Sequence, residues 1–149
     1  MLGPETMGTL LSPADRQALV NSVATHEGFR AKPYTDTVGK LTIGYGRNLT
    51  NVGISRKEAA FLLANDLDAA EQSCRDAFDW FDQLSPARQR VLIEMAFNLG
   101  FRKLLGFGQT LKACQEGRYA DAAARMLTSR WAQQVGQRAV TLAEQMRVG

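Results

Sequence analysis

The chain is poor in cysteine and histidine, the residue types that build disulfide frameworks and many metal sites. Among its 149 residues, two are cysteine and one is histidine. Cys74 and Cys114 match no metal-ligand spacing, and His26 is the one imidazole, so we expect no metal site. Without a secretory context, the two cysteines are predicted to be buried thiols rather than a disulfide.

Long apolar runs are also missing, which argues against a membrane-spanning helix. The longest dense run, from Val91 to Phe97, is interrupted by Glu94 and is far shorter than the roughly 20 residues that a membrane span needs. Residues 1–11 carry Glu5 and no Lys or Arg before their few apolar residues, so they lack the layout of a secretory signal. We therefore expect the chain as given to be made and folded in the cytosol.

Charge of one sign is not concentrated anywhere in the chain. The content is 45% hydrophobic and 22% charged with a formal net charge of +3, which is typical of one globular domain. The small positive excess favours a polyanionic partner, but the basic residues are scattered, so a solvated surface of mixed charge is the preferred interpretation. No nucleic-acid-binding motif or basic helix is present, and we expect no nucleic-acid partner.

A first helix is predicted over residues 12–27. Ser12 is a suitable N-cap and Pro13 suits the first helical turn. The apolar positions repeat at intervals of three and four residues, and Glu27 continues that stripe, so its side chain should lie beside an apolar face. Gly28 then supplies a helix stop.

The remaining sequence predicts an α+β protein that is mainly helical. Residues 28–54 are rich in glycine and in β-branched or aromatic residues, which is typical of a small, twisted antiparallel sheet. Residues 55–77 start with the capping box Ser55-Arg56-Lys57-Glu58 and continue as a long helix. Further helices are expected from Ser85-Pro86 onward and around residues 109–115, 119–128 and 137–147.

Two carboxylates and a threonine suggest a chemistry. Cleavage of a glycosidic bond usually needs one carboxyl that stays protonated and one that stays ionised. Glu27 ends a helix, where the dipole disfavours negative charge, and it adjoins an apolar stripe, so it suits a general acid. Asp36 lies in a polar turn that can keep it ionised, and Thr42 offers a hydroxyl to hold a water. Gly44 and Gly46 leave room for a sugar near the backbone.

Taken singly, each of these residues has an ordinary explanation as a solvated, turn or strand residue. Their common spacing is what favours a function. Glu, eight residues, Asp, five residues, Thr resembles the phage-type lysozymes (endolysins) of glycoside hydrolase family 24. Further segments occur in that family's order, and the resemblance covers residues 20–149. These further segments are Thr42-Ile43-Gly44-Tyr45-Gly46, Ala96-Phe97-Asn98-Leu99-Gly100, Gly106-Phe107, Ser129-Arg130-Trp131 and Gln137-Arg138-Ala139.

The resemblance implies a lysozyme-like fold of two lobes within a single domain, residues 1–149. A small β-sheet lobe, about residues 28–54, would be joined by the long helix, about residues 55–77, to a larger helical lobe, about residues 78–149. Helix 12–27 would pack on the helical lobe, and residues 1–11 would form an N-terminal tail.

The resemblance also implies an activity without a cofactor, the hydrolysis of the β-1,4 bond between N-acetylmuramic acid and N-acetylglucosamine in bacterial peptidoglycan, which causes cell lysis. Glu27 would be the catalytic acid, while Asp36 and Thr42 would handle the nucleophilic water. A carboxylate followed by a water-holding threonine fits inversion better than a covalent intermediate. The candidates for substrate binding are Gly46, Phe97, Thr110 and Arg138.

Some of these candidates have a second interpretation. Phe97 could be a core aromatic and Thr110 an ordinary helix residue, whereas Arg138 could steady the carboxylate of Glu27 and oppose its protonated form. Many relatives carry His after the sheet-lobe glycine, where this chain has Arg47, so any ion pair or sugar contact there must differ.

Two other functions remain open from the sequence. A lytic transglycosylase also needs a catalytic Glu but forms an anhydro-sugar, and an inactive peptidoglycan-binding module of a virion would need no catalysis. With peptidoglycan as partner we expect a monomer that is made in the host bacterial cytoplasm. It would reach the wall through a membrane lesion, or as a virion or injected component.

An aromatic cluster of Phe78, Trp80 and Phe81 lies between two predicted helices. An aromatic platform for sugars is conceivable there, but a core or lobe-junction role is favoured. Trp131 has the same interpretation.

Overall fold

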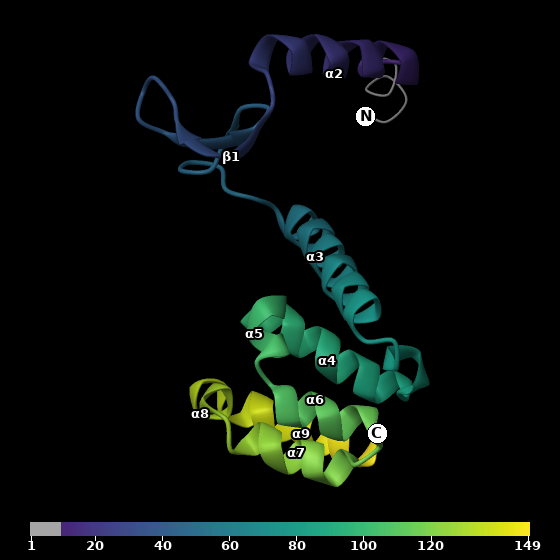
Figure 1. Cartoon of the computed structure of the whole chain (residues 1–149). Coiled ribbons are helices and arrows are strands. Elements are labelled where there is room, and N and C mark those ends of the chain that lie inside the picture. Colours follow the sequence, from purple (N-terminus) through teal and green to yellow (C-terminus); the bar gives the residue numbers. More distant parts are fainter. Residues whose placement is uncertain (1–9) are drawn as a thin grey trace, which may run out of the picture. The chain divides into compact units, whose positions relative to one another are not determined.

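The computed structural model describes residues 10–149, so residues 1–9 of the expected N-terminal tail lie outside the described residues. Figure 1 shows the order of the elements along the chain. Contacts within the chain divide it into an N-terminal unit that ends at Glu58 and a C-terminal unit, Ala59–Gly149. The boundary falls in the first turn of the longest helix, α3 (Arg56–Ala77).

Within the described residues, the first element of the N-terminal unit is helix α2 (Pro13–Glu27), as predicted. The side chain of Ser12 accepts the N–H of Asp15 at 3.1 Å and so satisfies one of the free donors of the first turn. Gly28 ends the helix with φ +72°, and its N–H donates to the carbonyl of Ala24 at 2.9 Å. No residue of α2 is buried, so the packing of this helix on the helical lobe stays a prediction.

Three strands follow α2 and form one antiparallel sheet in the order β1-β2-β3. The strands are β1 (Arg30–Thr35), β2 (Leu41–Gly44) and β3 (Arg47–Asn48). Thr42 pairs with Tyr34 on one side and with Asn48 on the other, so it lies on the central strand. The antiparallel sheet predicted within residues 28–54 is confirmed.

The predicted capping box starts helix α3. The N–H of Glu58 donates to the hydroxyl of Ser55 at 3.1 Å, and the N–H of Ser55 donates to Oε1 of Glu58 at 2.8 Å. Two backbone donors are thus satisfied reciprocally, which fixes the first turn. The helix ends at Ala77, where the sequence pattern predicts its end.

The C-terminal unit is built from helices. The helices with a clear start signal or apolar period agree with the predictions. The sequence did not predict α5 and α8, because their five and six residues are too few to show a helical period. The elements after α3 are η1 (Phe81–Gln83), α4 (Pro86–Leu99), α5 (Phe101–Leu105), α6 (Gly108–Gln115), α7 (Tyr119–Leu127), α8 (Arg130–Val135) and α9 (Gln137–Val148).

The apolar core of the described residues lies in this C-terminal unit. Phe78 and Phe81 are buried, which confirms their predicted core role, but Trp80 is only partly buried. Trp131 is also buried, and its indole N–H donates to Oδ1 of Asn98 at 2.7 Å, so the polar atom of this core side chain has a partner.

The two cysteines belong to the core. Cys74 and Cys114 are both free and buried, as the sequence predicts. Burial raises the pKa of the Cys74 thiol to about 11 and that of the Cys114 thiol to about 12. Both thiols are therefore protonated and unreactive at neutral pH.

The protein therefore has the mainly helical α+β fold that the sequence predicts, with a small three-stranded sheet in the part that the structure describes. Within residues 10–149, no helix is long and apolar enough to cross a membrane.

Candidate active site

Glu27 is the last residue of α2, and its carboxylate lies against the turn between β2 and β3. A Cβ atom at Gly46 would be only 3.0 Å from Oε2 of Glu27. Gly46 also has φ +88°, a left-handed conformation that L side chains rarely adopt. Two separate constraints thus favour glycine here, and one of them is the approach of the Glu27 side chain.

Asp36 organises the loop that joins β1 to β2. Its Oδ1 atom accepts the backbone N–H of Val38 at 3.0 Å and that of Lys40 at 2.7 Å. Its own N–H donates to the carbonyl of Lys40 at 2.9 Å. Among the described residues, Oδ2 of Asp36 has no hydrogen-bond partner, so one oxygen fixes the loop and the other can accept a bond from water.

Thr42 is buried on the central strand, with 4% of its surface exposed. Its hydroxyl donates to the carbonyl of Lys40 at 3.0 Å. The same carbonyl accepts the N–H of Asp36, so the backbone of Lys40 connects the two candidate residues. Because the hydroxyl proton of Thr42 is already committed, its oxygen can serve a further group only as an acceptor.

Arg47, the residue that departs from many relatives, pairs with the first turn of α3. Its Nη1 donates to Oε1 of Glu58 at 2.7 Å and to the carbonyl of Gly53 at 3.1 Å, while Nη2 contacts Oε2 of Glu58. The Arg47 hydrogen bonds, followed by the N–H of Ser55, lower the pKa of Glu58 to about 2. The strand that follows Gly46 is thereby tied to the capping box of α3.

The sequence could not identify this role of Arg47. The capping box was visible as a local pattern, but nothing in it indicates that Glu58 also binds a guanidinium 11 residues earlier. The sequence shows an arginine directly after a glycine turn and a capping glutamate downstream, but it does not show that the two side chains meet.

The other substrate-binding candidates lie in the C-terminal unit. Phe97 is 42% exposed, and it lines a depression of about 320 Å³ together with Arg138 and Glu94. Arg138 donates from Nε to Oε2 of Glu94 at 2.8 Å. Thr110 is buried and lines a different depression of about 480 Å³. The structure thus brings Phe97 and Arg138 together, and the expected contact of Arg138 with Glu27 stays a prediction.

A metal site in the described part of the chain would need a group of side chains that could bind the ion. Residues 10–149 contain no group of three or more His, Cys, Asp or Glu side chains placed to hold an ion.

Comparison with known proteins gives the class of the molecule. A family model described as Phage lysozyme matches residues 24–147, a range that includes every candidate site residue. A curated relative, "Probable T4-type lysozyme 1" from Dictyostelium discoideum, is 26% identical over an aligned length of 141 residues, and the match covers 75% of this chain and 83% of the relative. The fold and these matches define a lysozyme, an enzyme that acts on peptidoglycan. The chain belongs to the phage lysozyme family.

Proposed function

We propose that the protein is a muramidase that hydrolyses the β-1,4 bond between N-acetylmuramic acid and N-acetylglucosamine, with Glu27 as general acid. The approach of Oε2 of Glu27 to Gly46 carries this proposal. Gly46 follows β2 (Leu41–Gly44) by two residues, so the carboxylate reaches the sheet that holds Thr42. A proton donor thus lies beside a glycine near the end of β2. Because this glycine has no side chain, a sugar can approach the backbone there.

The hydrogen bonds of Asp36 and Thr42 support a role in holding the nucleophilic water. The Thr42 hydroxyl donates to Lys40, and Oδ1 of Asp36 accepts two N–H groups, so both residues can only accept from a water. A water that donates one O–H to Oδ2 of Asp36 and the other to Oγ1 of Thr42 keeps a lone pair free for attack on the anomeric carbon.

Direct attack by this water supports inversion of configuration. Asp36 takes a proton from the attacking water while Glu27 gives one to the departing glycosidic oxygen, and the water enters opposite the leaving group. We assign substrate contacts to Gly46, Phe97, Thr110 and Arg138, because the first lacks a side chain and the others line depressions.

The general acid is tested with Glu27→Gln, which keeps the shape of the side chain but removes the proton donor. Clearing of purified cell walls should slow by at least about 10²- to 10⁴-fold. Glu144→Gln is the matched control, because Glu144 is an exposed glutamate whose ion-pair partner within residues 10–149 is Arg147 alone. If Glu27→Gln remains folded and clears walls at the wild-type rate, the assignment is wrong.

The products separate hydrolysis from transglycosylation. Hydrolysis adds water and leaves a hydrated reducing end, whereas a transglycosylase leaves an anhydro-sugar and does not need Asp36. We expect hydrated ends by mass spectrometry, and we expect Asp36→Asn to be strongly impaired. Anhydro products together with an active Asp36→Asn variant would identify a transglycosylase, and a glycosyl group trapped on Asp36 would contradict inversion.

A further inference from the structure

We infer that the C-terminal unit carries a second binding site for peptidoglycan, which takes an amino-sugar ring together with a carboxylate of the peptide stem, in an open depression beside Trp80. The depression has a volume of about 690 Å³ and lies between the Phe78–Trp80 segment and one face of α6. None of the residues that line it is a candidate for catalysis or for binding at the cleavage site. The choice of ligand rests on the proposed function, since peptidoglycan is the polymer on which the enzyme acts.

An aromatic wall forms one side of this depression. The Trp80 indole stacks on the ring of Phe78, with centroids 4.8 Å apart and planes 19° apart. Phe78 is 6% exposed and contacts Phe101 at 5.9 Å between centroids, so the partner of the indole is anchored in the core. Trp80 itself is only partly buried. A fixed, accessible indole suits the apolar face of a pyranose ring, because packing the two removes apolar surface from water.

Helix α6 forms the opposite side and provides space and polar groups. Gly108, Leu111, Lys112 and Gln115 follow one another at intervals of three, one and three residues, which places them on one face of the helix. A Cβ at Gly108 would meet nothing within 4 Å, and its φ is not in the left-handed region, so the space in front of it is open. In the described chain, the side chains of Lys112 and Gln115 make no hydrogen bond.

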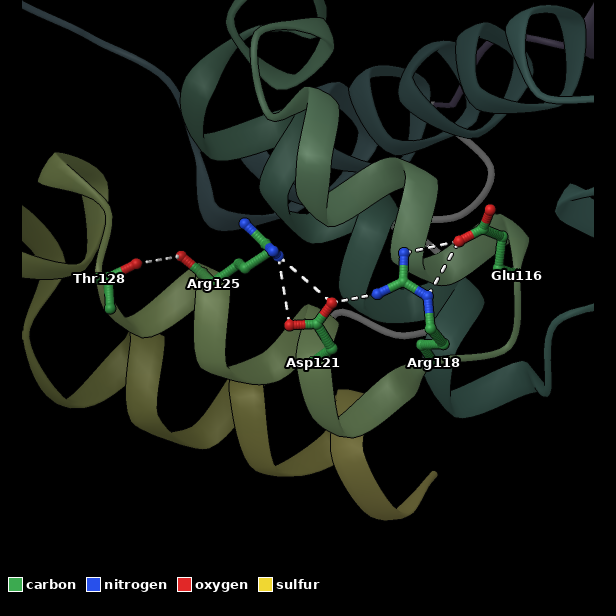
Figure 2. A network of polar contacts seen from close by, with 5 residues as sticks. All are labelled: Glu116, Arg118, Asp121, Arg125 and Thr128. Carbon is green, nitrogen blue, oxygen red and sulfur yellow. Dashed lines mark hydrogen bonds and ion pairs between the residues drawn. The ribbon is translucent and has the colours of Figure 1, made fainter.

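The charges at the rim favour an anionic ligand. Glu116 also lines the depression, but its Oε1 accepts from Nε and Nη2 of Arg118 at 2.9 and 2.6 Å. Figure 2 shows this pair, which continues through Asp121 to Arg125. The negative charge of Glu116 is therefore matched, whereas the described residues provide no ion-pair partner for Lys112. The lining thus presents one uncompensated cation beside an aromatic ring.

Peptidoglycan carries both groups that these two features recognise. Its amino-sugar rings offer apolar faces for Trp80, and its peptide stems carry carboxylates for Lys112. A site of this kind would hold the enzyme on an insoluble wall between cleavage events and so raise the local concentration of bonds to be cut.

The test measures binding of the protein to insoluble cell walls in the Glu27→Gln background. Trp80→Ala and Lys112→Ala should each weaken binding by roughly 5- to 10-fold. Trp80→Phe should retain most of the binding, because it keeps a flat ring. Lys103→Ala is the matched control, because it removes the same charge from an exposed residue that does not line the depression, and it should change binding by less than about twofold.

Two further measurements keep the site separate from catalysis. With Glu27 intact, Trp80→Ala and Lys112→Ala should cleave short soluble fragments at the wild-type rate. On chitin, an uncharged polymer of N-acetylglucosamine, binding should depend on Trp80 but not on Lys112.

The inference is overturned if both alanine variants bind walls like their parent, if Lys103→Ala weakens binding as much as Lys112→Ala, or if cleavage of soluble fragments falls. Clearing of walls by the Glu27→Gln sample itself would count against the general acid alone, since the comparison between the Trp80 and Lys112 variants would still decide the second site.

Discussion

Gly46→Ala tests whether the turn after β2 positions Glu27, the proposed catalytic acid. The new Cβ would lie 3.0 Å from Oε2 of Glu27, closer than ordinary van der Waals contact, so the carboxylate must move by a few tenths of an ångström or more. The left-handed φ of +88° adds about 1–2 kcal/mol of backbone strain. Displacements approaching 1 Å cost about 10²-fold in rate, so we expect cell-wall clearing to slow by roughly 10- to 100-fold.

The control for Gly46→Ala must carry the backbone strain without the contact. Gly117 has φ +75°, lies in the C-terminal unit, and a Cβ there would meet nothing within 4 Å. Gly117→Ala should therefore lose a similar free energy of unfolding in urea, about 1–2 kcal/mol, and retain its clearing rate. Equal rates for the two variants, measured well below their unfolding transitions, would refute the positioning of Glu27 by Gly46.

Other outcomes concern charge, reactivity and packing. Because Arg47 holds the pKa of Glu58 at about 2, below its usual 4.5, their interaction stabilises the native state above pH 4.5 and is lost as the pH falls toward 2. The urea midpoints of wild type and Glu58→Gln should converge over that range, and a constant difference would contradict this. Cys114, with a pKa near 12, should react with thiol reagents only on unfolding, so rapid labelling of the native protein would be the contrary result. Asn98→Ala should lower the free energy of unfolding by about 1 kcal/mol, because the indole N–H of the buried Trp131 loses its acceptor at a half-buried position. Urea unfolding checks this, and Asn98→Asp, which keeps an acceptor, should lose less.

Three of the predicted helices, α2, α3 and α4, have local start signals. Ser12 and Ser85 each accept a backbone N–H three residues on, and Ser55 forms its capping box with Glu58. These bonds depend on four neighbouring residues, so a short window of sequence contains what is needed to recognise them. Helix α8 had the same kind of signal, since Ser129 accepts the N–H of Ala132 at 3.2 Å, but its six residues leave no period to support it.

The same difference between local and distant partners divides the candidate site. The loop bonds of Asp36 reach no further than Lys40, and Thr42 donates to that residue too, so this part of the site is encoded within a few positions. Arg138, by contrast, meets Glu94 across 44 residues of sequence, a pairing that exists only once the helices have packed.

Gly46 and Arg47 stand between these two cases. Adjacent residues of the same turn face different partners, since Gly46 meets the end of α2 and Arg47 meets the start of α3. Thr42 is the one buried residue in the described part of the N-terminal unit. Hydrogen bonds and ion pairs, more than an apolar core, therefore fix the turn that contains Gly46 and Arg47. A spacing of Glu, Asp and Thr therefore indicates which chemistry to expect, whereas the contacts around Gly46 and Arg47 involve partners that this spacing does not reveal.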